Sequence, residues 1–293
     1  MGTVLEAIDV HFSYPDGHKA LHGVNFRADR GEVVALLGAN GCGKTTFFQH
    51  FNGLLQPEKG EIILKGQPLK DRAADEVFRT VGLVFQDPND QLFAATVYED
   101  ISYGPTNLGL PGNEIEKRVE RAIELMGLRE LQNKNIHALS YGQKKRVAIA
   151  GILALEPEII VLDEPTAGLD PVGASRLMHL LKSVQKEIKM TVILSTHEVD
   201  IVPIYCDRVY VMNKGRICLE GSPHTVFAQA EVLRGLNLRL PRVAHLVEVL
   251  GAKDGWNIEK PGLTISQARK ALNSCLQDRL GGQTGDIAVG RNK

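Results

Sequence analysis

Short apolar segments separated by turns make up the start of the chain. Residues 8–14 alternate apolar and polar side chains, which is the period-two pattern of a half-buried strand, and residues 15–17 form a Pro-Asp-Gly turn. A second strand is predicted over 21–28. Residues 33–37 are all apolar, which predicts a strand buried on both faces, and a helix is expected from residue 44 to about 55.

Strands and helices alternate through the middle of the chain. Continuous apolar runs predict further buried strands over 81–85, 159–162 and 192–194. Between the first two of these, apolar side chains recur at helical spacing from Ile115 to Met126, and we expect Asn113 to cap that helix. The alternation predicts an α/β fold with a largely parallel sheet.

The pattern changes after a predicted hairpin over 209–219. Amphipathic patterns beyond it predict helices and no further strands. We therefore predict a first domain over 1–221, a small mostly helical appendage over 222–280 as a candidate for dimerisation, and a flexible tail over 281–293.

Composition limits the classes of function. Of the 293 residues, 43% are hydrophobic, which is enough for a sizeable core, and 34 Lys and Arg against 35 Asp and Glu give a net charge of -1. That balance argues against a broad grip on nucleic acid. No run approaches the roughly 18–20 apolar residues of a membrane span, and the N-terminus lacks a signal-peptide pattern. Four separated cysteines favour reduced thiols, so we expect a soluble cytosolic protein able to dock on a membrane protein.

A phosphate-binding loop follows the strand at 33–37. Residues 38–46 match the pattern GxxxxGK[ST] between a predicted strand and a predicted helix. Glycines let main-chain N–H groups converge on phosphate oxygens, and the helix N-terminus adds a positive dipole. We expect Lys44 to approach the β- and γ-phosphates and Thr45 to ligate Mg²⁺. The expected nucleotide contacts of the loop are Gly38, Asn40, Gly41, Cys42, Gly43, Lys44, Thr45 and Thr46.

Two further segments carry chemistry. Asp163 and Glu164 follow the buried strand at 159–162, so the first is placed to hold Mg²⁺ and the second to orient and deprotonate an attacking water. Ser140 and Gln143 have the spacing of a capping box that opens a helix. With Gly142 beside it, that helix N-terminus is a second candidate anion site.

The ordered set of motifs resembles the ATP-binding cassette (ABC) ATPases. Residues 139–143, Leu-Ser-Tyr-Gly-Gln, resemble the signature motif of that family. Gln86 resembles the glutamine of the Q-loop, Asp170 the aspartate of the D-loop, and His197 the switch histidine. Tyr14 resembles the aromatic residue that stacks on adenine.

The resemblance extends over about residues 4–220 and implies the fold of a P-loop NTPase. The family fold consists of a RecA-like α/β core, an antiparallel β subdomain and a helical subdomain, here at about 87–155. It makes residues 1–221 an ABC nucleotide-binding domain and residues 222–280 an addition to it.

The resemblance also implies a mechanism. Two such domains sandwich two ATP molecules, each between the phosphate loop of one subunit and the signature of the other. Glu164 is then the base and His197 a contact of the γ-phosphate, while Gln86 senses Mg²⁺ and the attacking water. The implied Mg²⁺ ligands are Thr45, Gln86 and Asp163, the residues completing the partner's site are Ser140, Gly142 and Gln143, and Asp170 couples the two sites. One chain carries all these positions, which permits a homodimer and leaves a heterodimer with a second ABC ATPase open.

Residues 86–105 and parts of the appendage resemble a subgroup, the energy-coupling-factor importers, and most closely their cobalt and nickel uptake ATPases. This implies an ATP-hydrolysing subunit at the cytoplasmic face of the cell membrane, joined to a transmembrane coupling subunit and a substrate-binding membrane subunit, with no nucleic-acid partner. Its cargo is expected to be cobalt or nickel ion. The alternatives are a vitamin or other importer of the same type, and a soluble ABC ATPase without a transport role.

Three other features have ordinary structural explanations as well as functional ones. Cys42 stands where the family usually has serine, and it is either a small space-filling residue or a thiolate with a lowered pKa. His18 and His22 lack a third ligand nearby, which argues against a metal site. The basic residues 144–146 are expected to form a solvated helix face.

Overall fold

The computed structural model describes residues 2–256, 258 and 262–282. The chain divides after Pro223 into two compact units. Searched over the described residues, the helices include none with the length and apolar character needed to cross a bilayer.

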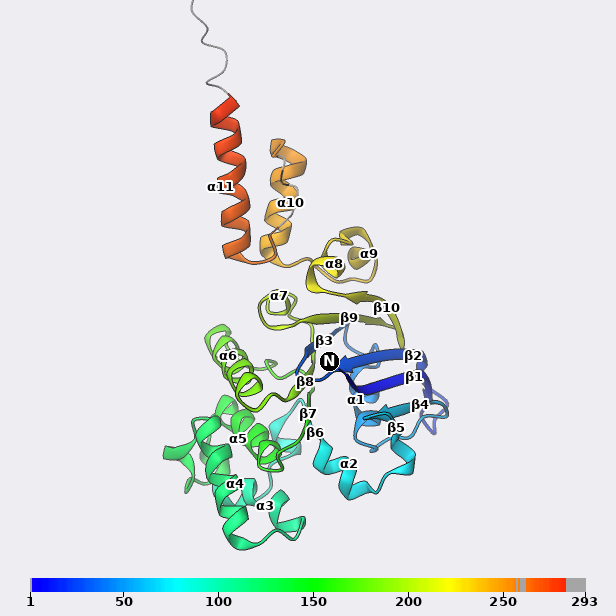
Figure 1. Ribbon diagram of the computed structural model, residues 1–293, viewed down its shortest axis with the longest axis vertical. Coiled ribbons are helices and arrows are strands. Elements are labelled where there is room, and N and C mark those ends of the chain that lie inside the picture. The colour runs from blue at the N-terminus through cyan, green and yellow to red at the C-terminus, as the bar shows by residue number, and fades with distance from the viewer. Residues whose placement is uncertain (1, 257, 259–261, 283–293) are drawn as a thin grey trace, which may run out of the picture. The chain divides into compact units, whose positions relative to one another are not determined.

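The first unit is built around a six-stranded sheet (Figure 1). The strands from β9 to β6 are parallel to their neighbours, and β10 pairs antiparallel with β9 at one edge. Strands β3, β6, β7 and β8 are buried along their whole length, as their continuous apolar runs predict. In spatial order the strands are β10 (Arg216–Gly221), β9 (Arg208–Asn213), β3 (Val33–Leu37), β8 (Thr191–Thr196), β7 (Ile159–Leu162) and β6 (Val81–Val84).

A second, antiparallel sheet packs over helix α1 (Lys44–Phe51). The helix contributes Phe47, Phe48 and Phe51, each at most 1% exposed, to a core cluster that also contains side chains from both sheets. Burial of these three aromatic rings fixes α1 between the sheets, and with it the loop that precedes the helix. The strands of this sheet, in spatial order, are β2 (Lys19–Asp29), β1 (Thr3–Ser13), β4 (Lys59–Leu64) and β5 (Gln67–Pro68).

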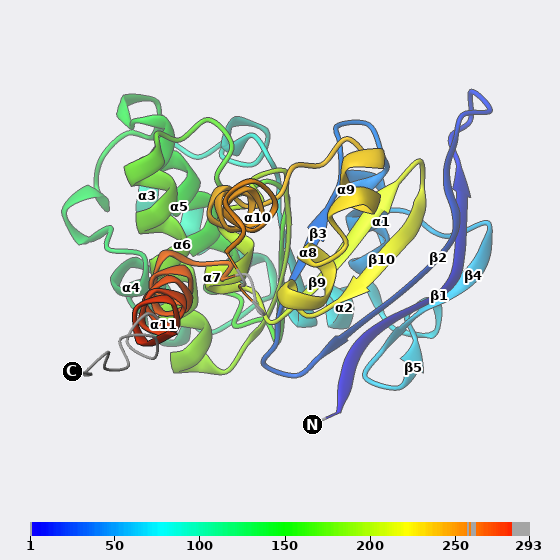
Figure 2. The same ribbon diagram turned by 90° about the horizontal axis from the view of Figure 1, so that it is seen from above.

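Helices α3, α4 and α5 contact one another and lie on the opposite side of the central sheet from the antiparallel sheet (Figure 2). Two of them begin with a complete capping box, α3 at Thr96 and α5 at Ser140. Besides α1, the helices of this unit are α2 (Ala74–Thr80), α3 (Val97–Asn107), α4 (Gly112–Leu125), α5 (Tyr141–Leu153), α6 (Pro171–Ile188) and α7 (Val202–Tyr205). Short 3-10 turns lie at Leu69–Asp71, Pro88–Asp90, Arg129–Leu131 and Ile136–Ala138.

The second unit is helical in the part that the structure describes, and its two long helices, α10 and α11, contact each other. Its elements are α8 (Pro223–Phe227), which begins at the division, α9 (Ala230–Gly235), α10 (Arg242–Asp254) and α11 (Ile265–Gly282). The amphipathic patterns of the sequence predicted helices here. The predicted tail lies outside the described residues from 283 onward.

The α/β class and the parallel buried strands are confirmed, but several local predictions are wrong. Period two places Ile8 on the buried side, whereas it is 39% exposed, because a bulge at Asp9 (φ 47°) shifts the phase of β1. Asn113 does not cap α4, since Pro111 takes the N-cap position and Asn113 is already inside the first turn. Helix α1 ends at Phe51 rather than near residue 55, because the chain turns at Gly53 (φ 79°).

Candidate active site

The parallel register brings the chemical motifs to one edge of the central sheet. Leu37 of β3 pairs with Thr196 of β8, and Leu162 of β7 pairs with both Leu194 and Val84. The strands therefore end at the same edge, and the residues that follow them lie side by side. These residues are the phosphate loop from Gly38, the carboxylates Asp163 and Glu164, His197, and Gln86.

A cavity of about 590 Å³ lies at this edge, within the usual size range of ligand pockets. Its lining contains most of the predicted nucleotide contacts together with residues that were not predicted. The predicted members are Tyr14, Asn40, Gly41, Gly43, Lys44, Thr45, Thr46, Gln86 and Glu164. The others are His18, Lys19, Ala20, His22, Lys214 and Gly215.

The phosphate loop needs glycine at its last position. Gly43 has φ 108°, and a Cβ there would lie 2.9 Å from the carbonyl oxygen of Ala20. Lys44, the first residue of α1, is only 6% exposed. Its Nζ donates hydrogen bonds to the carbonyl oxygens of Gly38 at 2.9 Å and Ala39 at 3.3 Å. The loop thus holds an ammonium group at the start of the helix, where main-chain N–H groups are also free of helical partners.

Asp163 is held between two hydroxyl groups. Thr45 Oγ1 donates to Asp163 Oδ2 at 2.5 Å, and Ser195 Oγ donates to Asp163 Oδ1 at 2.5 Å. Ser195 is completely buried, and its Oγ also accepts the main-chain N–H of Glu164 at 2.8 Å. We did not predict a role for Ser195. The available signal was a hydroxyl residue directly after the apolar run at 192–194.

Glu164 is 6% exposed and lies between two basic groups. Its Oε1 is 3.4 Å from Lys44 Nζ, and its Oε2 is 3.1 Å from Nδ1 of His197. Glu164 has φ 43°, a left-handed conformation that is uncommon for residues with a side chain. The phosphate-loop lysine and the histidine therefore each contact one oxygen of the Glu164 carboxylate.

Tyr14 lies over the phosphate-loop helix. Its hydroxyl is hydrogen-bonded to Thr46 Oγ1 at 2.8 Å, and its ring stacks with that of His18 at a centroid distance of 6.4 Å. Sequence reasoning considered His18 only as a metal ligand and missed it as a neighbour of the aromatic residue. The signal was its position four residues after Tyr14, across the turn that leads into β2.

The signature residues lie apart from this cavity. Ser140 Oγ accepts the main-chain N–H of Gln143 at 3.3 Å, and Gln143 Oε1 accepts that of Ser140 at 2.9 Å. Neither residue nor Gly142 belongs to the described lining of the cavity. Asp170 likewise caps α6 by accepting from the N–H of Gly173 at 2.8 Å. The fold brings the phosphate loop, the carboxylates and His197 together, but not the signature.

Residues 21–167 match the protein-family model described as ABC transporter. The chain is 55% identical to an energy-coupling factor transporter ATP-binding protein, EcfA, of Methanocaldococcus jannaschii, over 94% of this chain and 99% of that protein. It is 51% identical to EcfA2 of Clostridium perfringens, over 92% and 96% of the respective lengths. The chain is an ABC ATPase of the energy-coupling-factor type.

Solved structures agree with this assignment of the ATPase. CbiO1 from Clostridium perfringens, part of the ABC transporter complex cbiONQ, is 50% identical with a TM-score of 0.74, covering 85% of this chain and all of that one. A dimeric post-hydrolysis state of the ATP-binding cassette MJ0796 with ADP and Pi is 29% identical with a TM-score of 0.67, covering 75% and 98%. The fold is that of a P-loop ABC cassette, and the ATPase couples ATP hydrolysis to transport.

The prediction that residues 144–146 form a solvated helix face is wrong for Lys145. Lys145 is 4% exposed, and its Nζ donates to the main-chain oxygen of Glu164. Arg146 Nη1 donates to the carbonyl oxygens of Met126 and Gly127, both at 3.1 Å. The reason is that α5 packs against α3 and α4 as well as near β6, so a short basic run cannot stay on one exposed face.

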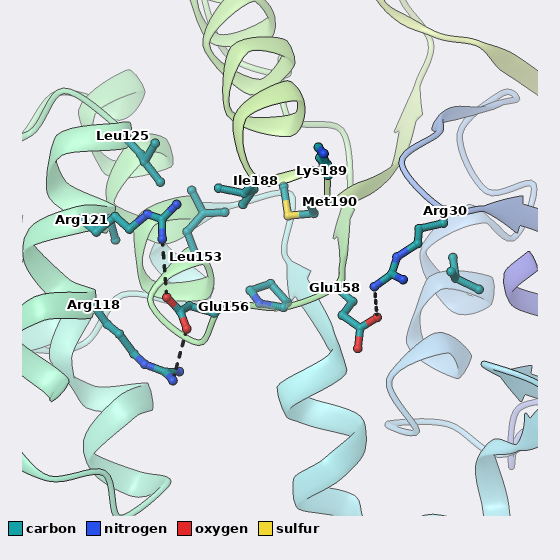
Figure 3. Close-up of a pocket in the computed structure, with 13 residues that line it drawn as sticks. Arg30, Arg118, Arg121, Leu125, Leu153, Glu156, Glu158, Ile188, Lys189 and Met190 are labelled. Carbon is teal, nitrogen blue, oxygen red and sulfur yellow. Dashed lines mark hydrogen bonds and ion pairs between the residues drawn. The ribbon is translucent and has the colours of Figure 1, made fainter. Parts of the chain in front are cut away.

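A second cavity, of about 300 Å³, lies at the opposite ends of the same strands. Figure 3 shows two carboxylates held from different sides: Glu156 by Arg118 at 3.2 Å and Arg121 at 3.9 Å, and Glu158 by Arg30 at 3.2 Å. These partly exposed pairs contribute about 0–1 kcal/mol each. They connect α4 and the turn after β2 to the loop that precedes β7.

The surroundings of Cys42 favour a small space-filling residue over a reactive thiolate. Its side chain is buried, at 5% exposed, against the phosphate loop. Burial raises the pKa of its thiol, and this outweighs the opposite effect of Lys44. The thiolate, which is the reactive form, is therefore scarce at neutral pH.

We predict that Cys42 resists alkylation. With iodoacetamide at pH 7.5 it should react at least ~10-fold more slowly than the exposed Cys218, because the Cys42 side chain is buried and burial raises the pKa of its thiol. Mass spectrometry of peptides over time gives both rates in one sample. In denaturant the two rates should converge. Equal rates in the native protein would contradict the assignment.

Proposed function

We propose that this ATPase energises the uptake of cobalt or nickel ion, as the ATP-binding subunit of an energy-coupling-factor importer at the cytoplasmic face of the membrane. The observation that carries the ATP chemistry is that Lys44 and His197 both contact the carboxylate of Glu164, which lines the cavity together with Lys44. The cation cargo is supported by the likeness of residues 86–105 to cobalt and nickel uptake ATPases and by the cbiO1 neighbour. The names of the sequence relatives do not specify a cargo.

The phosphate loop binds the triphosphate of ATP. The Lys44 ammonium and the N–H groups at the start of α1 supply positive charge for the β- and γ-phosphates. Tyr14 stacks on the adenine, and Lys19 and Lys214 add positive charge to the lining. These roles account for the basic side chains of the cavity without a metal site formed by His18 and His22.

The residues around Thr45 suit Mg²⁺. Its hydroxyl and the Asp163 carboxylate are hard oxygen donors whose atoms already converge at 2.5 Å, and Gln86 lines the same cavity. Thr45, Gln86 and Asp163 would hold the ion. When bound, Mg²⁺ offsets the negative charge of the phosphates.

Glu164 acts as the general base of hydrolysis. Its carboxylate accepts a proton from the attacking water, and its burial limits access of bulk water to the site. His197 orients Glu164 Oε2 through their 3.1 Å contact and reaches toward the γ-phosphate. Gln86 senses the occupied site from the cavity wall.

Two copies of the chain make two complete sites. Ser140, Gly142 and Gln143 lie outside the lining of their own chain's cavity, which supports their use by a partner's ATP. The dimeric MJ0796 cassette with ADP and Pi is a structural precedent for two associated cassettes. ATP binding then favours the closed dimer and hydrolysis the open one, and this cycle drives the membrane partners.

The appendage at 222–280 is a further contact between subunits. Its long helices expose large apolar side chains, Leu246 at 52% and Leu276 at 43%, which a partner subunit could cover. A transmembrane coupling subunit and a substrate-binding membrane subunit complete the importer.

Glu164→Gln should retain ATP and lose turnover. Removing the base is expected to lower kcat about 10²–10⁴-fold, while the phosphate loop still binds MgATP and the dimer stays closed. Steady-state hydrolysis and light scattering with ATP measure the two effects. Turnover within twofold of wild type would remove Glu164 as the base.

Two companion variants make that experiment specific. Glu220→Gln, a change at an exposed carboxylate on β10, should leave hydrolysis unchanged. Lys44→Ala should instead lose nucleotide affinity, because its ammonium is the phosphate ligand. Normal ATP binding by Lys44→Ala would contradict the phosphate-loop assignment.

Purification of the tagged chain from its native membranes should bring two membrane partners with it. Reconstituted vesicles carrying that complex should accumulate radioactive Co²⁺ or Ni²⁺ only with ATP and not with Glu164→Gln. ATP-dependent uptake of a vitamin instead would assign the alternative cargo. Recovery of the chain without membrane partners would contradict the transport role.

A further inference from the structure

A lysine on the signature helix is buried beside the catalytic carboxylates. Lys145 of α5 is 4% exposed, and its Nζ donates a hydrogen bond of 3.0 Å to the main-chain oxygen of Glu164. The same Nζ lies 5.5 Å from the ring centre of Tyr141, within the signature motif itself. One side chain therefore contacts both the signature segment and the residue proposed as the base.

An ammonium group in this position is costly unless its surroundings compensate for the lost water. Burial lowers the pKa of Lys145 to about 8, and nearby carboxylates oppose that effect, so the group stays mostly protonated at pH 7. The carboxylates come from the loop after β6, the end of β7 and the segment after β8. They are Asp87, Asp163, Glu164 and Glu198. A buried charge with this environment is part of the site rather than of the solvated surface.

Lys145 contacts Glu164 through the main chain and not through the carboxylate. Glu164 adopts a left-handed conformation, φ 43°, which is strained for a residue with a side chain and persists only where its surroundings hold it. Its N–H is held by Ser195 at 2.8 Å, and its carbonyl oxygen accepts from Lys145 and from the N–H of Ala167 at 3.1 Å. These contacts fix both peptide groups that flank the residue. They therefore fix the backbone from which the carboxylate projects toward Lys44 and His197.

We infer that Lys145 is a positioning residue for ATP hydrolysis: it holds the carbonyl of Glu164 so that the carboxylate faces the reacting water. The inference rests on the proposed role of Glu164 as the base. Lys145 lies five residues after Ser140, which precedes the same helix. It therefore links Glu164, the proposed base of its own chain's site, to the helix whose N-terminus would contact the ATP of the partner's site. Binding of ATP by the phosphate loop does not involve Lys145, which is absent from the described cavity lining.

Lys145→Met tests this role because methionine keeps an unbranched apolar stem and removes the ammonium. We expect kcat to fall about 10–100-fold, as misplacing a catalytic group by ~1 Å does, while KM for MgATP changes less than about twofold. Lys145→Gln, which keeps an uncharged N–H donor, should give a kcat between those of Lys145→Met and wild type. Thermal unfolding of each variant reports whether the fold is intact.

Lys144→Met is the matched control. Lys144 is the preceding residue on the same helix, and its Nζ donates to Oδ1 of Asn89 at 2.8 Å. The kcat of Lys144→Met should equal that of wild type. Wild-type kcat in Lys145→Met, or a loss of kcat accompanied by an equal rise in KM and a lower unfolding midpoint, would overturn the inference.

Glu164→Gln, measured in parallel, separates this inference from the proposed function. Full turnover in Glu164→Gln contradicts the role of Glu164, whereas full turnover in Lys145→Met alone contradicts only the positioning role. If Lys145→Met does not fold, Lys145→Gln is judged by the same criteria. A folded Lys145→Gln with wild-type KM and reduced kcat supports the inference, and one with wild-type kcat overturns it.

Discussion

The in-register ends of the parallel strands are the constraint on which the site depends. Strands β3, β8, β7 and β6 end together, so residues more than a hundred positions apart become neighbours at one edge. Ser195 makes this juxtaposition specific. It binds the side chain of Asp163 and the main chain of Glu164 from the adjacent strand. A slip of one residue between β7 and β8 would separate these groups and reverse the faces of the strand.

The site concentrates charge that would be unfavourable elsewhere in the core. Lys44, Lys145, Asp163 and Glu164 are each at most 6% exposed. Buried charges persist where each has partners, and here two ammonium groups and two carboxylates lie close together at one edge of the central sheet. Hydroxyl and carbonyl groups supply the remaining contacts. The same arrangement that makes the site costly to fold gives it fixed donors and acceptors before ATP arrives.

The parts of the site that could be predicted from the sequence are those built from neighbouring residues. The phosphate loop is one continuous segment and the Asp163–Glu164 pair is another, and each directly follows an apolar run that predicts a buried strand. The capping box at Ser140 is likewise local and is present as predicted. Ser195 and Lys145 escaped prediction because their roles depend on which strand and which helix pack beside them. The prediction that Ile8 is buried was wrong for a related reason, because the bulge at Asp9 depends on the pairing of β1 with β2 and β4.

The separation of the signature from its own chain's cavity leads to the central claim, that one functional site is made by two copies. Mixing Lys44→Ala chains with Ser140→Arg chains tests it directly. Each variant alone lacks one half of every site and should be inactive. In a mixed dimer one site has both intact halves, so a 1:1 mixture should recover about a quarter of the wild-type ATPase activity. A mixture as inactive as either variant alone would contradict the account.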